Sequence, residues 1–588
     1  MVKSMIDYFA HAASADAIKA AFSSLATGDP NLQLRKDGML ADAEAEPDAM
    51  LLGLLIDHVV AHADSDGAEL ALLEKAAALW IKGQAVFDRM GDARVAIEAA
   101  LSDPGAPGAL DGVNAAKRAL AGVAADRRTL LADSQALRDE IDRMLHIGAH
   151  PRQSDVPAEQ WDWGNLFLGR RTDAFVRATL DRGRTPRSVA FAFGALCSYA
   201  GNAAGSAYLG QVVGGPRRSH RFRHGAARRT MGAWFRATRG LPATGAMAAV
   251  LRRSTDGGIS EDLFEAVTGA FADAFPRRPP PDIGLGIGRT VRHLELLDTF
   301  SLPSLPPPPR ADLAPLLELA PPGDLAGRIT PLAENAFGGP PPGGGGGGSG
   351  TTGADSKKAN GNLCVLVILV AVLLVVIIID CIVQLIDHGS CNPMDTINEI
   401  LGTNDEGLEA TSAAGLVAAA QAPSGAELVL ELHTAHMAVW KALSSAQTLM
   451  AQCGLVYPDG ALLGVPFHGQ FLSARQDENW PRKEDPAAED RFHRYPTTAG
   501  EHPLAGAQAF PLGAEPDAFL NGIPGWHSGN AAGLARDLWL QVARGQAETV
   551  NLDQDADRGL GHSCWRVKAG ASISDDPLAI EALAYDEV

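Results

Sequence analysis

Apolar residues recur at helical spacing through the N-terminal half of the chain. Side chains three or four positions apart lie on the same face of a helix, so this spacing predicts amphipathic helices. Turn sequences such as Gly28-Asp-Pro30 and Pro104-Gly-Ala-Pro-Gly108 separate them. We therefore expect a mainly α fold, with a helical domain at 1–150 and a helical region at 151–300 that joins it or forms a second domain. The clearest patterns cover residues 48–62, 68–90, 115–147, 161–180, 188–213, 226–238 and 259–275.

A segment rich in proline and glycine follows the helical region. The composition changes at Pro276, and residues 301–362 include Pro306-Pro-Pro-Pro309 and the glycine-rich run 338–350. Chains of this composition bury too little apolar surface to form a packed core and behave as flexible tethers. We expect residues 301–362 to be a disordered Pro/Gly-rich linker.

The longest apolar run of the chain begins directly after this linker. Leu363–Ile379 contains no polar residue, and the apolar character resumes after Asp380 and continues to Ile386. As a helix, residues 363–386 would rise about 36 Å, enough for a hydrocarbon core of roughly 30 Å. This pattern predicts a single transmembrane helix at 363–386, with Asp380 near one interface. The alternative is a buried core helix or a pair of strands.

The charges that flank the apolar run predict its orientation. Lys357 and Lys358 precede the run, whereas the chain after it carries Asp and Glu but no Lys or Arg before Lys441. Basic residues favour the cytoplasmic side of a membrane. The N-terminal residues lack the basic and apolar regions of a secretory signal. We expect a single-pass protein of the bacterial inner membrane with a cytoplasmic N-terminus.

Residues 387–588 are then expected to form an extracytoplasmic domain. Residues 396–420 and 425–454 have helical patterns, and the remainder is rich in Pro, Gly, His and Trp. This composition indicates a smaller α+β or irregular C-terminal domain.

Composition excludes a wholly disordered protein, because 46% of the 588 residues are hydrophobic. The net charge of −20 is divided unevenly. Residues 151–300 contain 21 Arg, no Lys and 13 acidic residues, a net charge of +8, whereas residues 387–588 contain 11 basic and 28 acidic residues, a net charge of −17. A basic domain near anionic lipid headgroups and an acidic domain beyond them agree with the predicted orientation.

The arginines that follow residue 216 are candidates for a basic surface that contacts the lipid bilayer or an acidic protein partner. A solvated helix face is the alternative interpretation. The arginines form scattered pairs without a recognisable nucleic-acid-binding motif, so no nucleic acid is expected as a partner. The predicted membrane or partner surface consists of Arg217, Arg218, Arg221, Arg223, Arg228, Arg229, Lys357 and Lys358.

Histidine pairs are the main candidates for metal chemistry. His58 and His62 lie at i and i+4, on one face of a predicted helix, and His146 and His150 repeat the spacing. Val59 stands where a zinc protease of this spacing carries its glutamate base, and no third ligand is identifiable. The favoured interpretation is structural, with zinc as the alternative. The sequence has no P-loop, nucleophile elbow or dinucleotide fingerprint, so neither catalytic residues nor cofactors are expected.

Two segments resemble bacterial zinc-dependent phospholipase C-like helical proteins. They begin Asp162-Trp-Gly-Asn-Leu-Phe-Leu-Gly-Arg-Arg-Thr-Asp173 and Thr185-Pro-Arg-Ser-Val-Ala-Phe-Ala-Phe-Gly194, and the second ends at Pro216. In that family this stretch supplies a His, an Asp and a His as metal ligands at four-residue spacing. The matching positions here are Ser198, Asn202 and Ser206. The resemblance implies a helical scaffold whose metal ligands are lost, a pseudoenzyme used for binding.

The leading functional hypothesis is a non-enzymatic, single-pass membrane protein that docks a cytoplasmic partner or large assembly. Its layout is similar to membrane proteins that tether contractile injection particles to the bacterial inner membrane. One alternative is a zinc-dependent phospholipase-like hydrolase that uses His58, His62, His146 and His150. Another is a membrane sensor with an extracytoplasmic ligand-binding domain.

Overall fold

The computed structural model describes two compact units that are each discontinuous in sequence. We call residues 1–70, 150–298 and 454–588 unit 1, and residues 71–149 and 299–453 unit 2. Their described residues are mainly helical and include no strand. The structure describes residues 5–102, 107, 162–169, 171–213, 221–255, 258–308, 454–459, 515–521 and 530–546, and part of 433–451.

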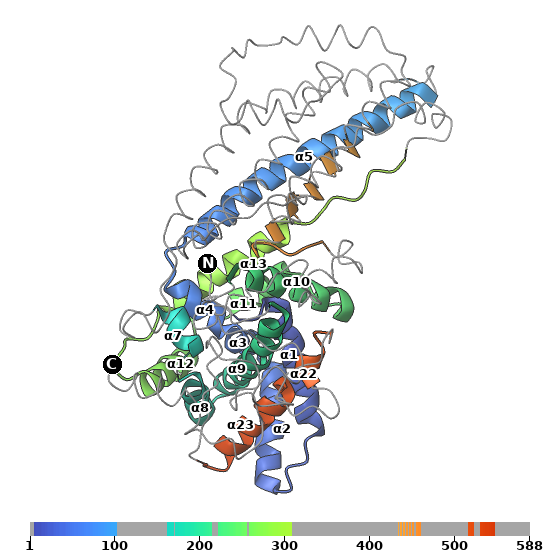
Figure 1. Cartoon of the computed structure of the whole chain (residues 1–588). Coiled ribbons are helices and arrows are strands. Elements are labelled where there is room, and N and C mark those ends of the chain that lie inside the picture. The colour runs from blue at the N-terminus through green and yellow to red at the C-terminus, as the bar shows by residue number, and fades with distance from the viewer. Residues whose placement is uncertain are drawn as a thin grey trace, which may run out of the picture. The chain divides into compact units, whose positions relative to one another are not determined.

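Unit 1 is a bundle of helices around α9 (Pro186–Val213) (Figure 1). α9 packs against α1, α2, α3, α8, α10 and α23. Its residues are apolar or small on nearly every side, as expected of a helix at the centre of a bundle. The other helices of unit 1 are α1 (Tyr8–Ser24), α2 (Pro30–Ala45), α3 (Pro47–Leu54), α4 (Ile56–Ala63), α7 (Trp163–Gly169), α8 (Thr172–Arg182), α10 (Arg221–Arg239), α11 (Thr244–Arg253), α12 (Glu261–Ala274), α13 (Ile283–Thr299), α22 (Ala518–Asn521) and α23 (Ala531–Ala543).

Several predicted helices are confirmed, but two of them are each divided into two shorter helices, and the helices predicted at 68–90 and 226–238 are longer than expected. Residues 48–62 form α3 and α4, which meet at Leu55, rather than one helix. Residues 161–180 divide in the same way, because Arg171 adopts a left-handed backbone conformation (φ 53°) between α7 and α8. Helix α13 was not predicted, because its glycine-rich start follows a run of prolines.

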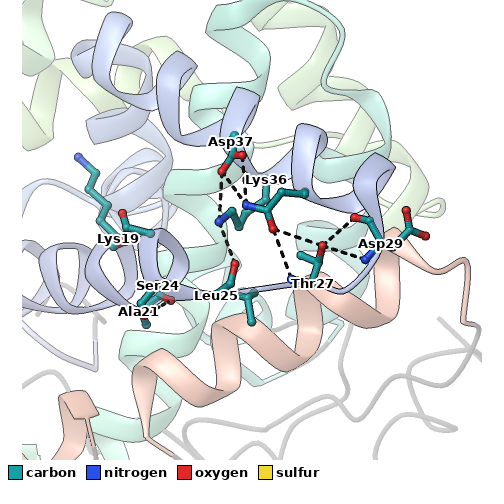
Figure 2. A network of polar contacts seen from close by, with 10 residues as sticks. Lys19, Ala21, Ser24, Leu25, Thr27, Asp29, Lys36 and Asp37 are labelled. Atoms are coloured by element: carbon teal, nitrogen blue, oxygen red, sulfur yellow. Dashed lines mark hydrogen bonds and ion pairs between the residues drawn. The ribbon is translucent and has the colours of Figure 1, made fainter.

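Polar contacts fix the connection between α1 and α2 (Figure 2). Asp29 caps α2 by accepting hydrogen bonds from the backbone N–H groups of Asn31 (2.8 Å) and Leu32 (3.3 Å). Lys36 is buried, and its ammonium group donates to the carbonyl oxygen of Leu25 at 2.9 Å. The same ammonium lies 3.1 Å from Asp37 Oδ1. A buried lysine therefore ties α2 to the end of α1.

C-terminal residues belong to unit 1 together with the N-terminal helices. The ring of Trp539 in α23 lies 5.7 Å from that of Phe22 in α1. Arg239 of α10 forms an ion pair with Asp517 at 2.6 Å. This arrangement differs from the sequence-based division, which set residues 387–588 apart as a separate domain.

Unit 2 contains most of the long helix α5 (Ala68–Ser102) and helical residues between 433 and 451. The side chain of Arg94 is buried between them. Its Nη1 lies 2.8 Å from His433 Nδ1, and its Nη2 donates to the carbonyl oxygen of Pro307 at 2.6 Å. Nearby, the rings of Phe87 and His436 lie 4.0 Å apart.

Several sequence-based predictions fall outside the described residues. They include the apolar segment 363–386, most of the linker and the predicted helix at 115–147. Among the residues that the structure does describe, no helix is both long enough and apolar enough to span a bilayer.

Candidate metal centre

Polar side chains gather in the core of unit 1, where α1, α4, α9 and α13 approach one another. His11 comes from α1, Asp57, His58 and His62 come from α4, and His293 comes from α13. Each is at most 2% exposed. Burial of polar groups at this depth costs free energy unless they find partners, so the cluster calls for a structural or functional reason.

Three of these residues have the geometry of a metal-binding set. His11, Asp57 and His58 each offer a donor atom, and the three atoms lie within 4.8 Å of one another. His11 Nε2 is 3.3 Å from Asp57 Oδ1. In a tetrahedral zinc site with bonds of 2.0–2.1 Å, neighbouring ligand atoms are about 3.3 Å apart. His11 Nε2 also lies 3.4 Å from Asp57 Oδ2, a long hydrogen bond, and both spacings suit two ligands of one ion.

Some ring nitrogens of the two histidines in this set lack a hydrogen-bond partner among the described residues. Both ring nitrogens of His58, and Nδ1 of His11, are buried without a hydrogen-bond partner among the described residues. The rings of His11 and His58 pack edge to face, 5.4 Å apart. Burial lowers the pKa of His58 well below its ordinary value, so its ring is neutral, which is the state that binds metals.

His293 belongs to the cluster, but its nitrogens are both engaged. Arg229 Nη2 lies 3.4 Å from His293 Nε2, and because a guanidinium only donates, Nε2 is the acceptor. In the neutral ring the proton is then on Nδ1, which donates to the hydroxyl oxygen of Tyr8 at 2.7 Å. Burial lowers the pKa of His293 well below its ordinary value, in agreement with a neutral ring. His293 is not among the three residues whose donor atoms converge.

His62 lies beside His293 rather than with the three donors. The two rings are 5.1 Å apart, and His62 Nε2 has no hydrogen-bond partner among the described residues. Burial lowers the pKa of His62 to about 4. His62 is a neutral neighbour of the candidate centre.

Helix α9 supplies partners to the carboxylate of Asp57. Asn202 Nδ2 donates to Asp57 Oδ2 at 3.0 Å, and Ser198 Oγ donates to Asp57 Oδ1 at a longer 3.4 Å. The hydroxyl of Ser206, one turn further along, donates instead to the carbonyl oxygen of Ala203. Ser198 and Asn202, but not Ser206, therefore contact Asp57, a residue of the candidate centre.

The structure brings together only some of the predicted site residues. His58 and His62 both lie in the core, whereas His146 and His150 are outside the described residues. His11 and His293 were missed, because neither has a second histidine at helical spacing, and the helix that carries His293 was itself not predicted. The apolar neighbours of His11 in the sequence are the one signal that it faces the core.

The predicted basic surface is wrong at two of its positions. Arg228 and Arg229 are 7% and 1% exposed, because α10 packs this part of its surface against α1 and α9. Arg229 Nε donates to the carbonyl oxygen of Gly454 at 3.1 Å, and its guanidinium lies over the ring of Tyr457. The side chains of the other predicted surface residues, Arg217, Arg218, Arg221, Arg223, Lys357 and Lys358, are not described.

The chain matches no protein-family model, no curated protein sequence and no solved structure.

Proposed function

We propose that unit 1 binds one divalent first-row transition metal through His11, Asp57 and His58. The observation that carries the proposal is the convergence of three buried donor atoms within 4.8 Å, with both ring nitrogens of His58 lacking a hydrogen-bond partner among the described residues. Two imidazoles and one carboxylate suit zinc and also iron(II).

The role we propose for the metal is structural rather than catalytic. All three ligands are buried in unit 1, so a lipid or other large substrate has no described route to the ion. The metal would join α1 to α4, and a ligand that binds only the folded state adds its binding free energy to stability. This proposal agrees with a non-enzymatic protein on a phospholipase C-like scaffold.

Metal analysis of the purified full chain tests the proposal. We expect about one zinc or iron per chain, and a lower melting temperature after removal by a chelator. Elemental analysis distinguishes the two metals. A chain purified without metal that also takes up neither zinc nor iron(II) at micromolar concentration would contradict the proposal.

The variant His58→Leu separates a metal ligand from an ordinary buried histidine. Leucine fills a similar volume and removes two unpaired polar atoms, so the metal-free variant should be at least as stable as the metal-free wild type. It should gain no stability when metal is added. His433→Leu, outside unit 1, is the matched control and should keep the metal-dependent shift. If His58→Leu binds metal as the wild type does, the ligand set is wrong.

We also propose that the chain is attached to a membrane through residues 363–386, as their apolar run suggests. A single crossing would place the residues before and after it on opposite sides of the bilayer, whereas α23 packs against α1 and α9 within unit 1. Lys357 and Lys358 favour the cytoplasmic side for the flank before the run. Because of the packing of α23, the proposal keeps the flank after the run on the same side. A cytoplasmic protein partner or large assembly would then dock at that face.

Reporter fusions test this placement. Fusions at the N-terminus and at the C-terminus should both report the cytoplasm, and the chain should sediment with membranes. A variant without residues 363–386 should leave the membrane fraction. Fusions that report opposite compartments would refute attachment from one side, and a wild-type chain that stays out of the membrane fraction would refute attachment altogether.

A further inference from the structure

Asn202 bridges the candidate metal centre and the N-terminal segment. Its Oδ1 accepts a hydrogen bond from the backbone N–H of Ile6 at 3.2 Å, and its Nδ2 donates to Asp57 Oδ2 at 3.0 Å. Because Oδ1 is held by a donor, the amide has one orientation, with its NH₂ group facing the carboxylate. The side chain is 1% exposed, so water does not compete for either contact.

Close packing around Asn202 limits how far its two hydrogen-bond partners can move. Gly201 and Gly205 lie on one face of α9, against Ile6 and α1. A Cβ added at Gly205 would lie 2.3 Å from Ile6 Cγ2. A Cβ at Gly201 would lie 2.9 Å from Ser14 Oγ. The backbone of Ile6 is thereby kept within reach of the Asn202 amide. A fixed amide in turn restricts how the Asp57 carboxylate can rotate.

Building on the proposed metal site, we infer that Asn202 is a positioning residue that orients Asp57 toward the metal. Residues that hydrogen-bond a ligating carboxylate fix its orientation, and their loss commonly weakens metal binding about 10- to 100-fold. Asn202 makes the shorter contact with the carboxylate, at Oδ2, while Oδ1 lies 3.3 Å from His11 Nε2, the other ligand of the proposed set. Ser198 contributes less, because its contact is 0.4 Å longer.

Four variants along α9 test the inference through metal affinity rather than activity. Zinc dissociation constants are measured on the full chain by competition with a chromophoric chelator. Asn202→Ala should weaken zinc binding about 10- to 100-fold. Ser198→Ala should weaken it by less, and Ser206→Ala, the matched control, should leave it unchanged because its hydroxyl bonds only within α9.

Asn202→Asp should change stability and affinity in opposite directions. The new carboxylate can still accept from Ile6, but it faces Asp57 at the present 3.0 Å contact, so the metal-free variant should melt at a lower temperature. A divalent ion removes this repulsion and gains a further carboxylate ligand, so zinc should bind more tightly than in the wild type. The cobalt(II) absorption spectrum should change with the added ligand. If Asn202 has only a structural role, Asn202→Asp should lower the melting temperature by the same amount with and without metal.

The outcomes separate this inference from the proposed function. If the wild type binds no metal, the metal site itself is refuted. If the wild type binds zinc, and both Asn202 variants bind it with the wild-type constant and cobalt spectrum, only the inference is overturned. Should Asn202→Ala fail to fold, Asn202→Asp and Ser198→Ala still decide between these outcomes.

Discussion

Two glycines decide how closely α3 approaches α9. A Cβ at Gly53 would lie 2.0 Å from the carbonyl oxygen of Phe191, and one at Gly194 would lie 2.1 Å from that of Met50. Real Cβ atoms do not approach other atoms so closely, so the two backbones can touch only where both helices lack side chains. This contact places α3, and α4 directly after it, beside the centre of the bundle.

We predict that Gly194→Ala destabilises the protein by about 3 kcal/mol, because the added methyl forces two backbones apart. Urea unfolding of the full chain measures the loss. Gly38→Ala is the control, since Gly38 lies in α2 with no neighbour within 4 Å of its Cβ position. It should raise stability by about 0.5–1 kcal/mol, as alanine does in a helix interior. Equal effects of the two variants would contradict the close approach of α3 and α9.

The buried ammonium of Lys36 offers a second prediction at this scale. Lys36→Met keeps the aliphatic stem but removes the donor to the carbonyl oxygen of Leu25, which should cost about 1–3 kcal/mol. Lys19→Met is the matched control, because the Lys19 ammonium points away from this network (Figure 2). Chemical unfolding of both variants decides, and the prediction fails if their midpoints coincide.

Helix starts show how a single residue shapes a whole element. Asp7, Asp29 and Asn530 each precede a helix and accept a hydrogen bond from one of its first backbone N–H groups. These donors have no partner within their own helix, so a short polar side chain before the first turn fixes where the helix begins. Such caps are visible in the sequence without knowledge of the fold.

Replacement of the α2 cap should weaken that helix measurably. Asp29→Ala should lower the free energy of unfolding by about 1 kcal/mol, since the N–H groups of Asn31 and Leu32 lose their acceptor. Asp29→Asn should retain most of the stability, because its amide oxygen accepts the same bonds. Amide hydrogen exchange in α2 provides the measurement, and exchange at the wild-type rate in Asp29→Ala would count against the cap.

At the scale of the whole molecule, each unit is assembled from distant stretches of the chain. Unit 1 combines three stretches and unit 2 combines two. In unit 2, residues near 300, 433 and 447 meet along α5 and its neighbours, as in the 2.8 Å hydrogen bond from Gln447 Nε2 to the carbonyl oxygen of Phe300. Formation of both units therefore requires the closure of long loops, which slows folding.

The stability of unit 2 should fall on acidification because of His436. Burial, followed by the charges of Arg94 and His433, lowers the pKa of His436 to about 4. In the unfolded chain the pKa of His436 has its ordinary value near 6.5, so between pH 6.5 and 4 the unfolded chain binds a proton at His436 and the folded chain does not. The free energy of unfolding is therefore highest above pH 6.5 and declines as the pH falls toward 4.

Hydrogen exchange in α5, corrected for the intrinsic rates, measures this loss between pH 7 and pH 5. His436→Leu is the informative variant, since it removes the titrating group and should flatten the decline. An equally steep decline in His436→Leu would assign the effect to another group.

Much of the local structure could be predicted from the sequence, because it depends on neighbours along the chain. Apolar spacing predicted the ends of α9 and α12 to within two residues, whereas α10 begins five residues before its predicted start. His58 and His62 lie on one helix, α4, as their i, i+4 spacing predicted, but only His58 belongs to the three converging donors.

The tertiary structure alone decided which polar groups meet in the core. Periodicity shows which face of a helix is apolar, but it does not show which other helix covers that face. His11 and Asp57 are 46 positions apart, and Asn202 lies 145 positions beyond Asp57. Only the packing of α1, α4 and α9 brings them together, and only the packing of α10 buries Arg228 and Arg229. Such long-range contacts depend on the fit of whole elements, which no local pattern of residues encodes.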